Sequence, residues 1–437
     1  MKLSRPLGLI AALSAVVLAT SLIHSTVSGE KFSLTYPPVV CSPVPSGLTG
    51  AVSLSSTKMP LRVIGSKSLA LKAAKKLRYT QRDSAVVIDA QGVTPVSFQV
   101  RLGKWVGTSL CSASTASQWF VGGIADVTTQ GKLLLVNSGL STAVADIEIW
   151  NESGPELTRA VTLKADSQVT IGLDSLSPGS RELVIHVITR SGRLSAFLSD
   201  ERGRGLKALG GDLINSTEAP AKIVNIPAIP HLVRSVGNRK TTLSHTLRIL
   251  NPGEFDARID VKVISTDGSF IPVGFENKSI ARGKVLALKL NPNMAAGKFG
   301  ISISSDQPIV AGIYSDTYAY NKSDFIWSTA APALTEFKIA VAGLSPQFIF
   351  TGESVDVTIN LAYSNGKRGV QRVRGQDIAL FQVPEGVASV TFSQIGREIY
   401  AGALVSSKSG YGYFPLASGS SLAKSSIPTS NIRVLTP

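Results

Sequence analysis

Histidines and carboxylates are the residues of this sequence whose types could support catalysis. After residue 30 the histidines are His186, His231 and His245. His186 alternates within the apolar strand LVIHVI, which predicts a structural role. A serine–histidine–aspartate triad is assembled in space, so an enzyme would need His186 or His231 beside Asp200 or Asp212. The sequence has no Gly-x-Ser-x-Gly, His-x-x-x-His or Cys-x-x-Cys motif to anchor such chemistry.

Other motifs give weaker signals of chemistry. Asp200, Glu201 and Asp212 could serve as paired acids for glycoside hydrolysis, but nothing in the sequence singles out two of them. Residues 202–211, RGRGLKALGG, lack the Lys-Ser/Thr ending of a phosphate-binding loop and are interpreted as a turn-rich connector.

Two serine–aspartate pairs, Ser199-Asp200 and Ser315-Asp316, recur at equivalent strand ends. Recurrence within a repeat favours structural turns over a calcium site. No cofactor or metal is predicted from these motifs, and we expect the chain not to be an enzyme.

Two clusters of basic residues are the most suggestive surface features. The first comprises Lys67, Lys72, Lys75, Lys76, Arg78 and Arg82. The second, in a turn-rich loop, comprises Lys367, Arg368, Arg372 and Arg374. The formal net charge is +15, and lysine and arginine attract phosphates and uronates. Anionic cell-envelope polymers or envelope proteins are the predicted partners, and two merely solvated faces are the alternative. Stacking aromatics are scarce in both clusters, which argues against nucleic acid.

The elements that position these residues come from an internal repeat. Asn137-Ser138-Gly139 aligns with Asn251-Pro252-Gly253, and the alternating strands ADIEIW and IDVKVI follow. In each corner, glycine is expected to supply a positive φ. RELVIHVITRSGRLSAFLSD aligns with GKFGISISSDQPIVAGIYSD, and each predicts a hairpin. The stretches IVNIPAIP, IAVAGLSP and IRVLTP are interpreted as strands that close successive copies.

The repeat predicts an all-β fold of tandem immunoglobulin-like β-sandwich modules at residues 126–235, 236–345 and 346–437. Residues 30–125 are a less regular β region, either a diverged fourth module or strands lent to the first clear copy. Within it, SKSLALKAAKKLRYTQR could form an amphipathic helix or a basic edge strand.

Residues 1–29 have the pattern of an export signal. Lys2 and Arg5 precede an uncharged apolar run, and Val27-Ser28-Gly29 fits a signal-peptidase site. Cleavage is predicted, and an uncleaved N-terminal membrane anchor is the alternative. The rest of the chain is expected to be secreted or associated with the cell envelope. In that oxidising setting Cys41 and Cys111 could form a disulfide, with two free thiols as the alternative.

The motifs CSASTASQWFVGG, LLLVNSG and LRILNPG, with SDQPIVAG downstream, resemble a family of uncharacterised exported actinobacterial proteins that share a domain of unknown function. In that family a cysteine precedes a Trp-Phe-x-Gly pattern, as Cys111 precedes Trp119-Phe120-Val121-Gly122 here. This sequence departs from the family in having Asn-Ser-Gly at the first corner, where Asn-Pro-Gly is usual. The resemblance covers most of the chain after residue 30. It implies an envelope-facing, non-enzymatic protein connected with surface-polysaccharide assembly, and it supplies no catalytic residues.

These observations predict a non-catalytic exported protein that acts as a structural, adhesion or binding component of the cell envelope. The alternative is an array of carbohydrate-binding modules that assists surface-polysaccharide assembly. That alternative needs Trp119, Trp150 or Trp327 exposed beside a groove, whereas their sequence positions favour packing.

Overall fold

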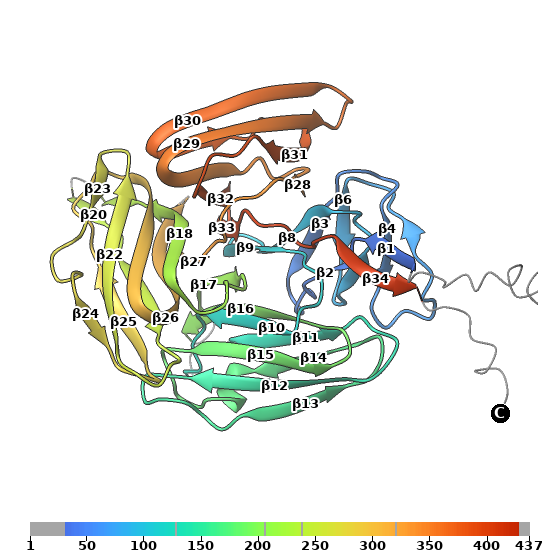
Figure 1. Cartoon of the computed structure of the whole chain (residues 1–437), viewed down its shortest axis with the longest axis horizontal. Helices are drawn as coiled ribbons and strands as arrows, with labels where there is room; N and C mark the ends of the chain where they lie inside the picture. The colour runs from blue at the N-terminus through green and yellow to red at the C-terminus, as the bar shows by residue number, and fades with distance from the viewer. Residues whose placement is uncertain (1–30, 127–128, 205–206, 237–238, 320, 428–437) are drawn as a thin grey trace, which may run out of the picture. The chain divides into compact units, whose positions relative to one another are not determined.

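A computed structural model describes residues 31–126, 129–204, 207–236, 239–319 and 321–427 (Figure 1). The predicted export signal at residues 1–29 lies outside these ranges. Apart from one 3-10 turn at Leu173–Ser175, the regular secondary structure of the described residues is β-strand, so the predicted all-β fold is confirmed. No helix in the described ranges is long and apolar enough to cross a membrane.

The chain divides into two compact units. In the smaller unit, β1 (Lys31–Thr35) pairs antiparallel with β34 (Ala423–Ile427). The larger unit, residues 36–421, contains all the other described strands. The predicted closing strand IRVLTP, at 432–437, lies outside the described residues.

The larger unit contains four β-sandwiches, named here in chain order. The first sandwich comprises β2 (Val39–Cys41), β3 (Thr49–Ser53), β4 (Pro60–Val63), β5 (Lys72–Ala73), β6 (Arg78–Gln81), β7 (Val86–Ile88), β8 (Val93–Arg101) and β9 (Trp105–Leu110). The second comprises β10 (Ser117–Val121), β11 (Lys132–Asn137), β12 (Ala143–Trp150), β13 (Arg159–Leu163), β14 (Ser167–Gly172), β15 (Val184–Ser191), β16 (Leu194–Arg204) and β17 (Lys207–Ile214).

The third sandwich comprises β18 (Ala221–His231), β19 (Val233–Val236), β20 (Arg239–Thr242), β21 (His245–Leu250), β22 (Ala257–Ser265), β23 (Gly268–Phe270), β24 (Lys278–Ile280), β25 (Val285–Leu290), β26 (Gly297–Ala319) and β27 (Lys322–Thr329). The fourth comprises β28 (Phe337–Ala340), β29 (Gln347–Tyr363), β30 (Arg368–Gln382), β31 (Val387–Ser393), β32 (Tyr400–Ser407) and β33 (Gly410–Pro415).

All four sandwiches have the same strand order. The two sheets of the first are β2-β7-β4-β5 and β6-β3-β8-β9, and those of the second are β10-β15-β12-β13 and β14-β11-β16-β17. In the third, β26 bends from one sheet into the other, pairing first with β18 and β22 and then with β21 and β27. In the fourth, β29 does the same, pairing with β32 near its start and with β31 near its end. The less regular N-terminal region is therefore a fourth copy of the repeat.

The sandwich boundaries differ from those predicted. β10, inside the predicted region 30–125, pairs with β15 of the second sandwich. IVNIPAIP forms most of β18 and pairs with β26, and IAVAGLSP begins in β28, which pairs with β31. These stretches therefore open a copy instead of closing one. The sequence of a strand between two copies is compatible with either copy. Only its hydrogen-bonded neighbours in the sheet show to which copy it belongs.

The predicted hairpins are also wrong. β15 and β16 follow each other in the chain, but β15 pairs with β10 and β12 whereas β16 pairs with β11 and β17 in the opposite sheet. The same crossing is made by β26 in the third sandwich and by β31 and β32 in the fourth. A strand–turn–strand pattern is common to a hairpin and to a connection between facing sheets, so sequence alone does not separate them.

The repeated Asn-x-Gly corners are held by their asparagine side chains. The Oδ1 atoms of Asn137 and Asn251, both fully buried, accept the N–H groups of Gly139 at 2.9 Å and Gly253 at 3.1 Å. Their amide nitrogens donate to the carbonyl four residues ahead, at 2.8 and 2.7 Å. Contrary to expectation, neither glycine has a φ in the left-handed region. A Cβ at either position would lie only 3.2 or 3.3 Å from the asparagine oxygen, so close approach explains the glycine.

The last strands of the four sandwiches pack against one another in a closed cycle. β9 contacts β17 and β33, and β27 contacts the same two strands. Glycines allow this close approach: a Cβ at Gly107 would lie 2.6 Å from the Leu213 nitrogen, and one at Gly211 would lie 2.6 Å from the Trp105 ring. In addition, β8 of the first sandwich pairs in parallel with β28 of the fourth. We call β9, β17, β27 and β33 the central strands.

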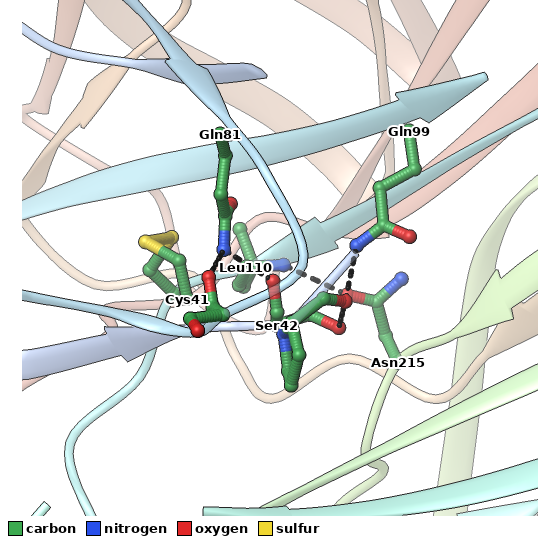
Figure 2. Close-up of a disulfide and its surroundings, with 9 residues drawn as sticks. Cys41, Ser42, Gln81, Gln99, Leu110 and Asn215 are labelled. Atoms are coloured by element: carbon green, nitrogen blue, oxygen red, sulfur yellow. Dashed lines mark hydrogen bonds between the residues drawn. A yellow bond between two sulfur atoms is a disulfide. The ribbon is translucent and has the colours of Figure 1, made fainter. Parts of the chain in front are cut away.

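Cys41 and Cys111 form a disulfide between β2 in one sheet and the residue directly after β9 of the other sheet (Figure 2). Both cysteines are fully buried. Gln81 and Gln99 donate from their amide nitrogens to the backbone carbonyls of Ser42 and Pro43, at 2.8 and 2.9 Å. The two glutamines, on β6 and β8, thus hold the segment that follows Cys41 against the opposite sheet.

Asn215, directly after β17, ties three sandwiches together. Its Oδ1 accepts the Leu110 N–H at 3.0 Å (Figure 2), and its Nδ2 donates to the carbonyls of Thr108 at 2.9 Å and Tyr413 at 2.8 Å. Because Asn215 is buried, these bonds replace lost contacts with water and fix the second sandwich against the first and fourth.

Candidate functional site

The first basic cluster surrounds a pocket in the first sandwich. Residues between 61 and 80 enclose a cavity of about 630 Å³. β5 is the edge strand of one sheet and β6 the edge strand of the other, so the pocket lies at an open edge of the sandwich. This edge is open because β5 has only two residues, whereas its counterpart β13 has five. The segment is strand and loop, so the helix alternative is wrong and the edge-strand alternative holds.

Apolar side chains form the walls of the pocket and lysines surround it. The apolar lining residues are Leu61, Val63, Ala70, Ala73, Ala74 and Tyr79. The lysines are Lys67, Lys72, Lys75 and Lys76. All four lysines are exposed, and within the described ranges no hydrogen bond or ion pair engages their ammonium groups. Leu69 and Leu71 in the same loop are 50% and 43% exposed. The pocket therefore combines free positive charge with accessible apolar surface.

The arginines of this region have structural partners. Arg78 Nη1 donates to the Gly343 carbonyl of the fourth sandwich at 2.6 Å, and its guanidinium lies 4.9 Å from the Phe98 ring centroid. Desolvation lowers the pKa of Arg78. Arg62, which sequence reasoning did not select, pairs with Asp166 of the second sandwich. Arg82 is exposed and lies outside the pocket lining. The four lysines are thus the part of the predicted cluster that is placed to bind an anion.

The second basic cluster is not a loop. Arg368, Arg372 and Arg374 lie on β30, and only Lys367 lies in the turn before it. Arg372 makes two hydrogen bonds of 2.7 Å to the carboxylate of Asp356 on the paired strand β29, and Arg374 lies 3.5 Å from the same carboxylate. The hydrogen bonds from Arg372 are the main reason why the pKa of Asp356 is lowered. Much of the predicted positive charge is therefore paired.

The predicted histidine–aspartate combinations do not form among the described hydrogen bonds. His231 Nδ1 lies 2.9 Å from His245 Nε2, and His245 Nδ1 lies 2.8 Å from Ser315 Oγ, beside the buried ring of Phe299. Burial lowers the pKa of His245 to about 3. His245 is therefore neutral at physiological pH and belongs to the core of the third sandwich.

His186 has two polar partners that the sequence did not suggest. Its Nε2 lies 2.8 Å from Ser117 Oγ, and its Nδ1 lies 2.9 Å from Glu148 Oε2. The three residues come from β10, β15 and β12, which are neighbours in one sheet. Neither the serine nor the glutamate stands in a recognisable motif, because the set is created by strand register.

Comparison with known proteins places the chain in a family. The profile of a family of unknown function, DUF5719, matches residues 89–403. The chain belongs to the DUF5719 family. The matched region runs from the end of β7 to within β32, so it includes parts of all four sandwiches. No curated protein matches the chain.

One solved structure similar to this DUF5719 protein is that of Thermotoga maritima 1070. The two share 16% sequence identity over 23% of this chain and 93% of the other, with a TM-score of 0.21.

The tryptophans of this DUF5719 protein are mostly core residues. Trp105 and Trp327 are each 1% exposed and Trp119 is 7% exposed, whereas Trp150 is half-buried and stacks on Trp119 at 5.5 Å. Trp119 and Trp150 belong to an apolar cluster between the second and third sandwiches. The rings of Trp105, Trp119 and Trp327 are therefore unavailable as platforms for sugar stacking, and the Trp150 ring is stacked on Trp119.

The acids that sequence reasoning considered for glycoside hydrolysis are structural. Asp200, fully buried, accepts from Arg202 at 3.0 Å and from the Trp327 indole at 3.1 Å. Asp212 accepts the backbone N–H groups of Trp327 and Leu213. Glu201 pairs with Arg101 at 2.6 Å. Among the described residues, no group of three or more His, Cys, Asp or Glu side chains is placed to hold a metal ion. Residues 202–211 lie mainly in β16 and β17, not in a connector.

Asp324 on β27 makes the stability of the packing between the central strands depend on pH. Its Oδ1 accepts the Gly211 N–H at 3.0 Å, and its Oδ2 is buried against Gly410 without a hydrogen bond. Desolvation raises the pKa of Asp324 well above that of an exposed aspartate. Folding therefore favours the protonated carboxyl. The contribution of Asp324 to stability is greatest below the pKa that this carboxyl has in the unfolded chain. It falls as the pH rises toward the higher pKa of the folded state.

We expect Asp324→Asn to raise the free energy of unfolding at pH 7 relative to the native chain. The difference should grow with pH by up to about 1.4 kcal/mol per unit. Urea denaturation between pH 5 and 8 measures it, with Asp267→Asn at an exposed position as the control. A difference that is independent of pH would contradict the expectation.

Proposed function

We propose that this chain is an exported cell-envelope protein whose binding component is the lysine-lined pocket of the first sandwich. Its ligand is an anionic envelope molecule that also has an apolar part. The proposal is supported chiefly by the pocket, where four unpaired lysines surround apolar walls. An anionic head group would contact the ammonium groups, and an apolar segment would lie along Leu61, Ala73 and Tyr79.

The location of the protein is part of the same proposal. The signal-like residues 1–29 and the disulfide within the first sandwich favour an oxidising compartment outside the cytoplasm. The resemblance to exported actinobacterial proteins supports it too. The carbohydrate-array alternative has less support, because the tryptophans it needs are largely buried.

The test is co-sedimentation of the purified chain with cell-envelope fractions over a series of salt concentrations. We expect the native chain to pellet at low salt and to be released as salt rises, because screening weakens attraction between exposed charges. Replacing Lys67, Lys72, Lys75 and Lys76 by glutamine should weaken binding by about 100-fold or more, since one lysine near an anionic surface contributes about 1 kcal/mol.

A matched control changes four exposed lysines elsewhere, Lys58, Lys104, Lys164 and Lys222, and removes the same total charge. This control should bind almost as well as the native chain. An equal loss of binding in the two variants would show that net charge alone causes the binding, and it would contradict a specific pocket. Absence of pelleting for the native chain would overturn the proposal.

A further inference from the structure

We propose that Ser117, His186 and Glu148 form a nucleophilic site that transfers or hydrolyses short, uncharged acyl esters. The inference goes beyond the proposed binding function and is independent of it. The site lies on the outer face of the sheet β10-β15-β12-β13 in the second sandwich, and it shares no residue with the pocket lined by residues 61–80.

Strand register brings the three side chains together. His186 is paired with Glu148 on one neighbouring strand and with Trp119 on the other, so these three residues form one row across the sheet. Ser117 lies two residues before Trp119 and therefore points to the same face. Separate ring nitrogens of His186 contact the serine at 2.8 Å and the glutamate at 2.9 Å. This is the connectivity of a catalytic triad, in which the acid orients the imidazole and the imidazole receives the serine proton.

The imidazole is held in a fixed orientation. The Trp119 ring stacks on His186 with a centroid separation of 3.9 Å and an interplanar angle of 9°. Trp150 in turn stacks on Trp119. Desolvation lowers the pKa of His186, and the hydrogen bond to Glu148 opposes that shift without reversing it. His186 is therefore neutral near pH 7, the state in which Nε2 accepts a proton.

Ser117 is accessible, in contrast to the half-buried His186. It borders a cavity of about 360 Å³ whose lining also includes Ser112, Ala113, Thr115 and Thr217. The lining combines small polar side chains with larger apolar ones such as Phe120 and Phe197, and Glu218 is the one charged residue in it. A cavity of about this volume, lined by neutral side chains and one carboxyl and by no cation, suits a short neutral acyl group and disfavours an anionic one.

The backbone N–H of Ser117 points toward the edge of β10 that faces the cavity. The Ala116 carbonyl accepts the Thr189 N–H, so the main-chain groups of Ala116 face β15. Main-chain groups alternate in an antiparallel pair, and the N–H of Ser117 therefore faces the opposite edge of β10. On that edge the Trp119 carbonyl accepts the Thr217 N–H. The nucleophile's own N–H is a known type of oxyanion donor, and here it faces the cavity-lining segment around Thr217.

The proposed reaction uses an ester and water. Ser117 Oγ attacks the acyl carbon while its proton passes to His186 Nε2. The carbon–oxygen bond of the ester then breaks, and His186 returns the proton to the leaving alcohol. Water, deprotonated by His186, next attacks the acyl-serine, and the proton returns to Ser117 as the acid is released. Glu148 accepts the hydrogen bond from His186 Nδ1 and stabilises the imidazolium in each step.

The test combines covalent labelling with turnover. The full chain is treated with a fluorophosphonate probe, the labelled peptide is identified by mass spectrometry, and hydrolysis of p-nitrophenyl acetate is followed in parallel. We expect labelling at Ser117 and its loss in Ser117→Ala. His186→Gln should slow both labelling and turnover by at least about 100-fold, the usual contribution of a general base. Ser141→Ala, at an exposed serine of the same sandwich, should change neither rate.

Glu148→Gln provides a second test in case a histidine variant does not fold. Its side chain is 34% exposed, so the change is unlike a core substitution. It should slow labelling and shift the pH at which the rate rises, whereas a role in stability alone would move the unfolding midpoint and leave that pH unchanged. Labelling absent from Ser117, or labelling of Ser117 at the native rate in both His186→Gln and Glu148→Gln, would overturn the proposal.

Discussion

Reduction of the Cys41–Cys111 disulfide is expected to lower the free energy of unfolding of the first sandwich by about 4 kcal/mol. The bond closes a loop with a sequence separation of 70, and the reduced unfolded chain regains the conformational freedom that this loop removes. One sheet of the first sandwich has short strands, such as β2 and β7 with three residues each, so this sheet supplies few ladder hydrogen bonds. The disulfide thus adds a covalent link between the two sheets to the contacts of their shared apolar core.

Urea denaturation with and without a reductant measures this effect, followed by hydrogen exchange of the amides in β2, β8 and β9. The variant with Cys41→Ala and Cys111→Ala should unfold at the same urea concentration whether or not reductant is present. A reduced native chain that loses less than about 1 kcal/mol would show that the unfolded first sandwich is already compact.

Replacing Arg248 by methionine is expected to destabilise the contact between the second and third sandwiches by about 3 kcal/mol. Arg248 is 4% exposed and donates to the carbonyls of Gly123 and Arg181, each at 2.8 Å. Its guanidinium also lies 4.7 Å from the centroid of the Trp327 ring. Burial lowers the pKa of Arg248 to about 10, so the side chain remains charged at neutral pH. Methionine keeps the apolar contact with Trp327 but leaves the two carbonyls without their donor.

The matched control for Arg248 is Arg181→Met, because the Arg181 side chain is 76% exposed and its ion pair with Asp126 measures 3.5 Å. We expect this control to change stability by less than about 0.5 kcal/mol. Thermal and urea unfolding of the two variants give the comparison. Similar small effects in both would mean that the cost of burying the Arg248 charge cancels its hydrogen bonds.

The fold class could be predicted because the repeat preserves features with a direct physical meaning. The alternation in residues 145–149 and 259–263 reports one buried face per strand, and the buried Asn137 and Asn251 mark the same corner twice. The first sandwich was harder to recognise because its strands are short and its corners differ. Boundaries and hairpins were misassigned because the facing sheet that receives β16 or β18 is chosen by contacts far away in sequence.

The candidate sites divide in the same way. Lys67, Lys72, Lys75 and Lys76 are close in sequence, so a local count of charges was enough to find them. The apolar walls of their pocket depend on the pairing of β4 with β5 and could not be read from composition. Ser117, Glu148 and His186 come from three separate strands and share no motif, so only the register of the sheet reveals them. Asp356 likewise neutralises Arg372 from across a strand pair.

The cycle of central strands constrains the order in which the chain can be completed. β9 and β8 of the first sandwich find their partners β33 and β28 in the fourth, the last sandwich to emerge when a chain is made or threaded across a membrane from its N-terminus. Until then the β28-facing edge of β8 is open, and an open strand edge invites pairing with other chains. The cycle thus closes as a final step of folding. A chain that stops before residue 337 would leave exposed the edge of β8 that β28 covers in the full chain.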